Sequence, residues 1–579
     1  EIDDLKQCLK NLNLSVEQIN KYKIQLSTED QMFLYSDLTS VKYPNIIKVC
    51  LELFNLTGDF YYHQQALKYA EQGRASIMLS LLRGNNGSKV GLIPDRYKNL
   101  EDSINNQIAL INQRLSTIKE GSQTKYKLNT QLDILSGKRT ELEKIYKSKY
   151  PAFYSLKYSS EVIGARQFQS TLSNDECVVE FLLNRNFLIS FYIDRKTLLI
   201  HTDTLRKIDL AQLAEKFYRR VSQFNPDQFK RDSIKHFALE GLKLYNILLK
   251  PFEEKIKGKK LIIVADNSLR KIPFEALLTT SPRDFNGYRD LPYLINRNPV
   301  YYAPSITFLN ELRQRPLVKK RAKLLAIAPV YSSLKLNDTI ARQLYAERSD
   351  TSVFGSLPNA QKEIDYANLI AGGRYLKEKE ASESKFKELA GKFDIIHIAT
   401  HGILNTESSL QSSLLFADSY PNDDGLLYIY EIYNLEQSSQ LVILSACNTG
   451  AGRNYGGEGV ISTGRGFLSS GSRSVIMTLW PVNDQASFEL IKGFYDGLKD
   501  KLTICEALRR SKISYMRTAD NMHCHPFFWT GYVIYGDASI SLSIQNNKGV
   551  FFLISGIILL IVVCWIIWRM KKKKHSSLR

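Results

Sequence analysis

Two apolar runs of the sequence each end in a residue that could take part in covalent catalysis. FDIIHIATHG (393–402) ends with His401 and Gly402, and LVILSACNTGAG (441–452) places Cys447 where the apolar run gives way to small polar residues and glycines. A cysteine nucleophile needs a neighbouring imidazole to form or hold the thiolate. Alone, Cys447 would be better interpreted as a buried structural thiol, but His401 lies 46 residues before it. The pair therefore predicts a His401–Cys447 dyad.

The surrounding pattern predicts the elements that must position this pair. From residue 322 onward, continuous apolar runs alternate with helical segments, which is typical of a mostly parallel sheet flanked by helices. In such sheets reactive groups gather where strands end. The pattern predicts a helix beginning at IPFEALL (272–278), and strands at 177–183, 187–193, 198–203, 261–266, 299–305, 322–330, 393–402, 441–450, 473–480 and 531–536.

The first 150 residues predict an all-α region. VCLELFNLTGDFYYHQQALKYAEQGRASIMLSLLRG (49–84) has the small and aromatic residues of stacked helical hairpins and resembles a tetratricopeptide repeat. An ordinary helical bundle is the alternative. In this pattern Thr57-Gly58-Asp59 is expected to let a second helix pass close by. Residues 95–148 predict a long antiparallel helical hairpin, broken at Gly121-Ser122 and closed by Pro151.

VFFLISGIILLIVVCWIIW (550–568) contains no charged residue. At 1.5 Å per residue this run is about 28 Å long, close to the hydrocarbon thickness of a bilayer. RMKKKK follows it. The positive-inside rule predicts a single-pass membrane protein with a cytoplasmic tail and residues 1–549 on the other side. A tail-anchored protein, cytoplasmic except for its anchor, is the alternative.

Charge and cysteine content exclude several other classes. Six of the formal +19 charges lie in the basic tail, so nucleic acid is not an expected partner. Seven cysteines without a CxxC pair predict neither a disulfide framework nor a zinc site. His523-Cys524-His525 is better interpreted as a turn before the last strand than as a metal cluster. We expect no metal and no cofactor.

Five segments together resemble the CHAT family of caspase-like cysteine peptidases, which commonly follow tetratricopeptide repeats. These are HIATHG (397–402), LVILSACNTGAG (441–452), GEGVISTGRGFLSSGSRSVIMTLWPVND (457–484), HPFFWTGYVIYGD (525–537) and, upstream, KLIIVADNSLRKIPFEALL (260–278). The resemblance implies His401 as the catalytic histidine and Cys447 as the nucleophile, with the backbone N–H groups of Gly402 and Cys447 stabilising the oxyanion. It also implies a caspase-like α/β fold whose N-terminal half is a degenerate copy of the catalytic half.

These observations predict a chain of six parts: tetratricopeptide-like repeats (1–90), a helical hairpin (91–159), the N-terminal half (160–315) and catalytic half (316–540) of a CHAT domain, a transmembrane helix (550–568) and a basic tail (569–579).

Several further residues are weaker candidates. Asp418 and Asp484 could be acids of a substrate pocket, as could Glu458. Trp480 could wall a subsite, although a packed core tryptophan is the commoner case. His397 is interpreted as structural. The glycine-rich segment GAGRNYGGEGVISTGRG (450–466) lacks the phosphate-loop pattern and is expected to be a flexible loop beside the site.

The sequence thus predicts a membrane-anchored cysteine endopeptidase that cleaves protein substrates, with its helical repeats recruiting a substrate or a regulatory protein. A non-catalytic, repeat-based interaction scaffold is the alternative.

Overall fold

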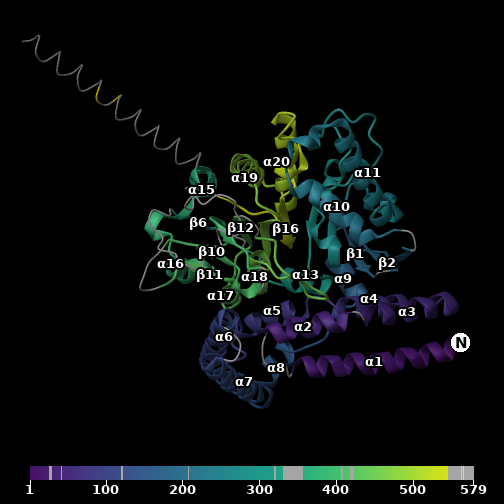
Figure 1. The fold of residues 1–579 in the computed structure, drawn as a ribbon, viewed down its shortest axis with the longest axis vertical. Coiled ribbons are helices and arrows are strands. Elements are labelled where there is room, and N and C mark those ends of the chain that lie inside the picture. Colours follow the sequence, from purple (N-terminus) through teal and green to yellow (C-terminus); the bar gives the residue numbers. More distant parts are fainter. Residues whose placement is uncertain are drawn as a thin grey trace, which may run out of the picture.

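The computed structural model describes residues 1–24, 29–40, 42–118, 122–184, 186–205, 208–317, 321–329, 357–405, 408–417, 423–446 and 449–544, together with Val563 and Trp565. Eight helices come first and lie along the lower side of the molecule in Figure 1. They are α1 (Ile2–Ile24), α2 (Glu29–Ser40), α3 (Tyr43–Thr57), α4 (Tyr61–Gln72), α5 (Ser76–Lys89), α6 (Asp95–Thr117), α7 (Gln123–Lys149) and α8 (Pro151–Lys157).

Helices α3 and α4 form the expected hairpin, but Gly58 between them has another role. Its φ is 67°, its N–H donates to Phe54 O at 2.7 Å, and a Cβ there would meet nothing within 4 Å. Gly58 therefore ends α3 by supplying left-handed backbone, and the expectation of a close helix crossing at this glycine is wrong.

The long helical hairpin is confirmed as α6 and α7. Its core joins Ile104, Ile108 and Ile111 of α6 to Leu128, Leu135 and Leu142 of α7. α7 ends at Lys149, so the hairpin closes just before Pro151 as expected, and Pro151 is the first residue of a further helix, α8. Proline is tolerated there because the first N–H of a helix has no intrahelical acceptor.

One eleven-stranded sheet runs through the rest of the described chain, in the order β3-β2-β1-β4-β5-β16-β15-β12-β8-β6-β7. Its pairs are parallel except for β1–β2, β2–β3 and β15–β16. The strands are β1 (Glu176–Leu183), β2 (Phe187–Ile193), β3 (Leu198–Thr204), β4 (Lys260–Val264), β5 (Val300–Tyr302), β6 (Leu324–Ala328), β7 (Gly373–Lys377), β8 (Ile395–Ala399), β12 (Leu441–Ser445), β15 (Ser474–Thr478) and β16 (Tyr532–Gly536).

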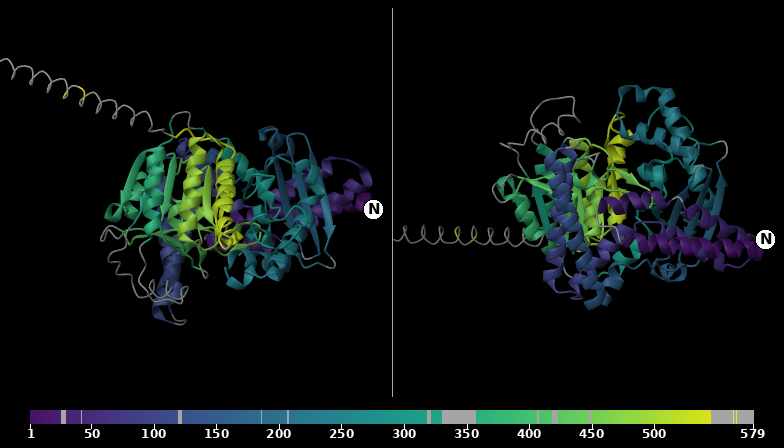
Figure 2. Two further views of the ribbon diagram at one scale, coloured as in Figure 1. Left: turned by 90° about the horizontal axis from the view of Figure 1, so that it is seen from above. Right: turned by 60° about the horizontal axis from the view of Figure 1, so that its bottom comes forward.

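Helices cover this sheet, with α15, α19 and α20 above it and α17 and α18 below it in the view of Figure 1, and Figure 2 shows the same layers from two other sides. The helices are α9 (Ala165–Thr171), α10 (Leu210–Ser222), α11 (Arg231–Leu248), α12 (Glu253–Ile256), α13 (Ile306–Arg313), α15 (Pro358–Ala371), α16 (Glu383–Leu389), α17 (Ile429–Tyr433), α18 (Thr463–Ser469), α19 (Asp484–Lys499), α20 (Ile504–Thr518) and α21 (Pro526–Trp529). Five short strands complete the described fold: β9 (Gly402–Ile403), β10 (Ser413–Leu415), β11 (Leu426–Tyr428), β13 (Asn454–Tyr455) and β14 (Gly459–Val460).

The helix expected to begin at IPFEALL is only a single 3-10 turn, Phe274–Ala276. After this turn the chain becomes extended and pairs with the segment near residue 293: Leu294 N donates to Leu277 O at 2.8 Å, and Leu278 forms a bridge with Tyr293. Tertiary pairing therefore outweighs the local helix-start signal of Pro273.

The sequence-based expectation of a transmembrane helix is corrected. Within the ranges given above, no helix combines the length and the apolar character needed to cross a bilayer. The longest, α1, α6 and α7, carry charged side chains along their length, and each such side chain is costly in hydrocarbon. Apart from Val563 and Trp565, residues 550–579 lie outside the described residues. The described residues therefore do not support the predicted single-pass topology, with its cytoplasmic tail, or the transmembrane element of the predicted fold class.

Buried charges join the helical region to the sheet. The Glu71 carboxylate accepts hydrogen bonds from Ile306 N (3.1 Å) and Thr307 N (2.7 Å) at the start of α13. Arg74 Nε lies 3.0 Å from Glu180 Oε1 in β1, and both side chains are buried. Burial raises the pKa of Glu180 to about 8, with Glu71 adding to the rise and Arg74 opposing it. The helices are therefore an integral part of the folded core.

Candidate active site

Strands β8 and β12 bring the two predicted site segments together. The strands are parallel neighbours, with Ile395 opposite Leu441 and Ala399 opposite Ser445. Beyond these pairs, Thr400 N donates to Ser445 O at 3.2 Å. His401 comes two residues after Ala399, and Cys447 comes two residues after Ser445. Cys447 itself lies outside the described residues.

The backbone on either side of His401 is fixed by strand pairing. His401 O accepts a hydrogen bond from Leu415 N at 3.0 Å, and Gly402 begins β9, opposite Leu414 of β10. The His401 side chain is 5% exposed. The histidine thus sits at the end of β8 between two sheets, where its position depends little on solvent-exposed loops.

Both flanks of the Cys447 position are anchored to β15. Thr478 Oγ1 donates to Ala446 O at 2.7 Å, and Gly450 N donates to Thr478 O at 2.8 Å. Thr449 O accepts from Gly464 N at 2.9 Å, at the start of α18. A Cβ at Gly450 would come within 3.0 Å of Thr478 O, so a larger residue would push this loop off the strand.

A buried polar network surrounds His397 of β8 and Ser445 of β12, in the strands that precede the two candidate site residues. His397 Nε2 lies 3.0 Å from Glu363 Oε1, and its Nδ1 lies 3.0 Å from the hydroxyl of Tyr495. The other oxygen of Glu363 accepts from Ser445 Oγ at 2.9 Å, and Ser445 Oγ in turn contacts the hydroxyl of Tyr532 at 2.8 Å. Helix α15 is thereby connected to both β8 and β12, and His397 has the surroundings of a structural histidine.

We predict that Glu363→Ala destabilises the protein by about 2–4 kcal/mol, because it leaves His397 and Ser445 buried without their shared partner. Thermal unfolding of the full chain measures the effect. Glu380→Ala, which removes an exposed carboxylate, is the matched control and should change stability by less than about 0.5 kcal/mol. Equal stabilities for the two variants would contradict a structural role for the network.

Two of the weaker candidates have partners outside the dyad segments. Trp480 is 2% exposed and its Nε1 donates to Phe527 O at 3.1 Å, so it is a packed core side chain. Asp484, the first residue of α19, accepts from Asn359 Nδ2 at 2.8 Å. Asp418 lies outside the described residues.

The glycine-rich segment after Cys447 has an ordered arrangement. Residues 454–460 form the β13–β14 hairpin, and α18 follows. Two buried guanidinium groups support the hairpin: Arg270 Nη1 donates to Asn454 Oδ1 at 2.7 Å, and Arg465 Nη1 donates to Val460 O at 3.2 Å. Burial lowers the pKa of both, that of Arg270 to about 10. Glu458, at the tip, is 1% exposed and accepts a hydrogen bond from Ile77 N of α5 at 3.1 Å.

The cluster His523-Cys524-His525 divides among separate partners. His523 Nδ1 contacts Asp520 Oδ1 at 2.8 Å, Cys524 Sγ donates to Met516 O at 3.3 Å, and His525 Nδ1 accepts from Phe527 N at 3.1 Å. His525 thus caps α21, and burial lowers its pKa to about 3. Such an arrangement fits a turn better than a shared metal.

Sequence reasoning missed the residues that support the two strand ends. Thr478 and Tyr532 are polar residues inside apolar strands, Glu363 lies in the mixed helix α15, and each makes hydrogen bonds near Ser445 or Ala446. For Thr478 and Tyr532 this position was a usable signal, because buried polar side chains need partners. Which partners they have depends on contacts between distant parts of the chain.

Fold and site together define an α/β protein with an attached helical region and a histidine and a cysteine that follow neighbouring parallel strands. The family model described as CHAT domain matches residues 240–537 of this chain. The chain belongs to the CHAT family, as the motifs of the sequence indicated.

Curated relatives share part of this chain. Tetratricopeptide repeat protein 28 of Homo sapiens is 23% identical over an alignment of 339 residues that covers 51% of this chain and 13% of that protein. Its Mus musculus counterpart matches over the same length with the same identity and coverage. The match thus spans only about an eighth of the length of these relatives, and their names fit the tetratricopeptide-like helices at the N-terminus of this chain.

Among solved structures, the separase–securin complex of Saccharomyces cerevisiae aligns with 92% of this chain and 40% of that chain, at a TM-score of 0.35 and 13% identity. The Arg-specific cysteine proteinase gingipain R aligns with 58% of this chain and 75% of that chain, at a TM-score of 0.32 and 8% identity. TM-scores this low do not establish a shared fold.

Proposed function

We propose that this chain is a cysteine endopeptidase that cleaves protein substrates with a His401–Cys447 dyad. The observation that carries the proposal is the register of β8 and β12, which pairs Ala399 with Ser445 two residues before each member of the dyad. Membership of the CHAT family adds support, because the motifs that define the resemblance contain both residues.

In the proposed reaction His401 takes the proton of the Cys447 thiol, and the thiolate attacks the carbonyl carbon of a peptide bond. The backbone N–H groups of Gly402 and Cys447 stabilise the oxyanion that forms. His401 then gives its proton to the leaving amine, which leaves an acyl-enzyme that water hydrolyses. The hydrogen bonds of Ala446 and Gly450 to Thr478 would keep the nucleophile's loop in place during these steps.

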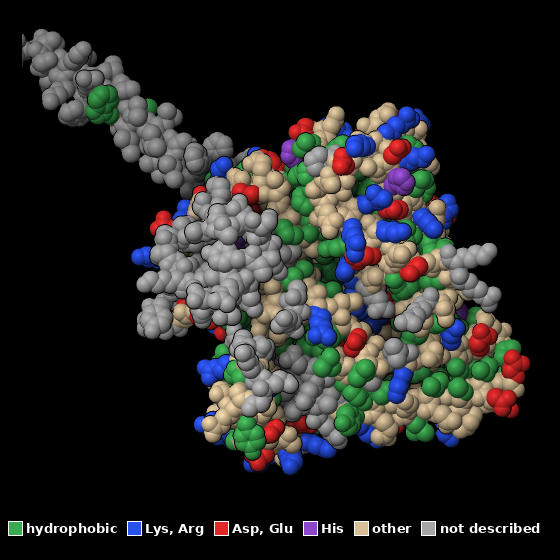
Figure 3. Space-filling model, viewed as in Figure 1, with side chains coloured by type: hydrophobic (Ala, Val, Ile, Leu, Met, Phe, Trp, Pro, Cys, Tyr) green, Lys and Arg blue, Asp and Glu red, His purple; other side chains and the backbone are tan. Residues whose placement is uncertain are grey.

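We also propose that helices α1–α4 recruit a protein substrate or regulator. Large hydrophobic side chains are exposed along these helices, a feature that marks interaction surfaces, and Figure 3 shows hydrophobic side chains gathered at the lower right, where this region lies. They are Leu14, Tyr22, Leu34, Leu38, Leu56, Phe60 and Tyr61. The proposal keeps the predicted domain division apart from the transmembrane helix: repeats (1–90), helical hairpin (91–159), the two halves of the CHAT domain (160–315 and 316–540) and the basic tail (569–579).

Incubating the full chain with a proteome-derived peptide library, with products identified by mass spectrometry, tests the proposal. We expect cleavage at defined positions, together with faster alkylation of Cys447 than of the exposed Cys8 by a thiol reagent. A folded chain that cleaves nothing and whose Cys447 reacts no faster than Cys8 would refute the peptidase.

A repeat-based interaction scaffold is the second candidate function. Two observations favour it: the curated relatives are named for their repeats, and the helical region is joined to the sheet through Glu71 and Arg74. Because of these buried contacts, deleting residues 1–90 would damage the fold, so point substitutions on the exposed face are the appropriate test of recruitment. Partner binding that persists in a chain without peptidase activity would establish the scaffold.

A further inference from the structure

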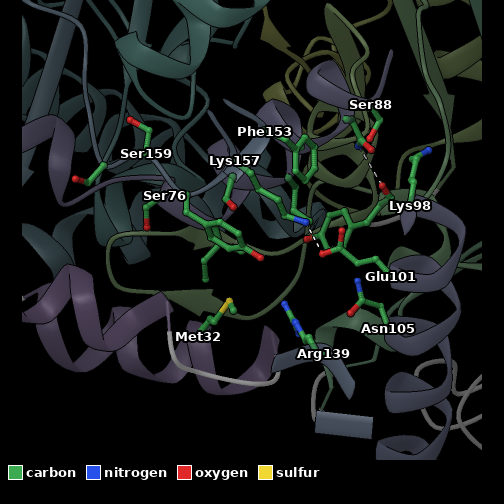
Figure 4. A pocket seen from close by; sticks show the side chains of 18 of the residues that line it. Met32, Ser76, Ser88, Lys98, Glu101, Asn105, Arg139, Phe153, Lys157 and Ser159 are labelled. Carbon is green, nitrogen blue, oxygen red and sulfur yellow. Dashed lines mark hydrogen bonds and ion pairs between the residues drawn. The ribbon is translucent and has the colours of Figure 1, made fainter. Parts of the chain in front are cut away.

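A cavity of about 360 Å³ lies where the N-terminal helices meet α17. Its walls come from α1, α2, α5, α6, α7 and α8 and from residues 158–160 after α8, with Tyr433 and Asn434 closing one side. Figure 4 shows Glu101, Asn105, Arg139 and Lys157 extending toward one another from three of these helices. None of these side chains belongs to the candidate active site.

The charges of the wall largely balance. Lys157 Nζ contacts the Glu101 carboxylate, which also accepts from the Tyr146 hydroxyl at 3.1 Å. Lys98 Nζ lies 2.6 Å from Glu436 Oε1, just outside the lining. With Glu436 counted, the cations and the carboxylates are equal in number, so the cavity does not select for a strongly anionic ligand: Lys21, Lys98, Arg139 and Lys157 against Glu17, Glu101, Asp102 and Glu436.

Two acceptors on one face of α6 are less well matched. Asn105 Oδ1 is buried and accepts no hydrogen bond within the described part of the chain. Asp102, one helical turn earlier, is 3.9 Å from Lys98, which lies closer to Glu436. A group rich in N–H donors, such as the ammonium or guanidinium of a lysine or arginine side chain, would satisfy both acceptors.

Burial raises the pKa of Asp102 to about 6, with Glu101 and Glu436 adding to the rise and Lys98 and Lys157 opposing it. The folded state therefore holds more protons than the unfolded state between about pH 4 and pH 6, and stability falls as pH rises through that window. We predict that Asp102→Asn raises the melting temperature above pH 6 and leaves it unchanged below about pH 4.

Melting curves across this pH range measure the effect of Asp102→Asn. Asp133→Asn, which changes an exposed aspartate of α7, is the control and should match the wild type throughout. A constant difference between Asp102→Asn and wild type at every pH would contradict the prediction.

The rest of the lining suits a short extended peptide. Small hydroxyl and amide side chains can each pair with backbone N–H and C=O groups whatever the peptide's sequence, and apolar groups stand beside them. The polar ones include Ser76, Ser80, Asn85, Ser88, Ser159 and Ser160, and the apolar ones include Met32, Ile77, Leu81 and Phe153.

Two residues of this wall also hold the hairpin that follows Cys447. The Glu458 carboxylate accepts from Ser76 Oγ at 2.6 Å and from Ile77 N at 3.1 Å, at the N-terminus of α5. Beside it, Ala75 N donates to Gly457 O at 2.9 Å and Gly456 N donates to Asp37 Oδ1 at 2.6 Å. The tip of the hairpin, Gly456–Glu458, is therefore bound to the back of the cavity wall.

We propose that this cavity binds a lysine- or arginine-containing peptide segment of a partner protein and that Glu458 transmits its occupancy to the hairpin behind the candidate nucleophile. The binding step stands alone, whereas its effect on catalysis rests on the proposed peptidase function.

Calorimetry with three capped peptides and the full chain tests the site. The peptides are acetyl-Ala-Lys-Ala-Ala-amide and its two analogues with glutamate or alanine in place of lysine. We expect the lysine peptide to bind at least about tenfold more tightly than either analogue. Asp102→Asn/Asn105→Leu should lose this preference, and Asp133→Asn/Asn129→Leu, at exposed positions of α7, should keep it. Equal affinities of the three peptides, or no binding at all, would overturn the proposal.

A benzophenone-bearing lysine peptide locates the site without relying on variants, because it should crosslink to helices that line the cavity of the wild type, which are α1, α2, α5, α6, α7 and α8. Crosslinks elsewhere would overturn the assignment. Hydrogen exchange then tests the transmission: the lysine peptide should slow exchange at residues 454–460, and Glu458→Gln should remove this change while keeping the binding. Neither readout needs catalysis. Normal binding and exchange without cleavage would therefore refute only the peptidase, whereas unchanged exchange on binding would refute transmission through Glu458.

Discussion

Cys447→Ala and His401→Ala are each expected to lower the rate of peptide cleavage by the full chain on the order of 10⁴-fold or more. The nucleophile and its base act as a unit, so removing either one removes the covalent route, and little further loss is expected in the double variant. Rates on a peptide cleaved by the wild type measure the effect, with substrate concentrations chosen to separate kcat from KM.

Cys8→Ala is the matched control for Cys447→Ala. Cys8 is an exposed cysteine in α1, far from Cys447 in the sequence. His397→Gln adds a sharper comparison. His397 shares strand β8 with His401 but contacts Glu363 and Tyr495, so its substitution should lower stability more than it lowers kcat. Cleavage that survives either dyad substitution would show that the activity belongs to another site.

Lys512→Met is expected to destabilise the folded chain by about 3–5 kcal/mol, the largest stability effect that we predict. Lys512 Nζ lies 2.9 Å from Glu275 Oε1 and donates to Tyr532 O at 2.6 Å, and both charged side chains are almost completely buried. The variant would leave Glu275 as a buried carboxylate with the Tyr302 hydroxyl as its remaining partner. Urea unfolding followed by tryptophan fluorescence measures the change in midpoint.

Arg510→Met, two residues earlier on α20, is the control for Lys512→Met. Arg510 pairs with Asp500 at 2.7 Å, but both side chains are exposed, and such pairs contribute about 0–1 kcal/mol. The double variant Lys512→Met/Glu275→Gln should recover part of the lost stability, because it removes the unpaired charge. A loss for Lys512→Met no larger than that for Arg510→Met would show that the buried pair contributes little.

Ten strand positions could be predicted from the sequence, and the structure has strands at all ten, from β1 to β16. Most of these strands are continuous apolar runs because the sheet buries both of their faces. The edge strand β3 is the exception, since most of its residues are partly or fully exposed. Strand β7 was missed because it lies at the sheet edge, where Arg374 and Lys377 are exposed and the apolar run disappears. The short strands β9–β11 and β13–β14 were missed because each is only two or three residues long, too short to show an alternating or apolar pattern.

The candidate site shows the same division. His401 and Cys447 stand out locally because each follows an apolar strand and is accompanied by glycine. The sequence does not show that Glu363, Ser445 and Thr478 support the site. Their hydrogen bonds form only in the folded chain, where the strands lie side by side.

By itself, the sequence determined the helical N-terminal region, the strands of the sheet and the two motifs that carry the proposed chemistry, because apolar periodicity and strand-terminal residue types are local properties. Only the tertiary structure decided that β5 and β16 join both halves of the chain into one sheet, and that Glu458 reaches α5 from a position 382 residues later in the chain. Such contacts depend on which buried surfaces and polar groups meet in the folded core, and no spacing along the chain encodes that choice.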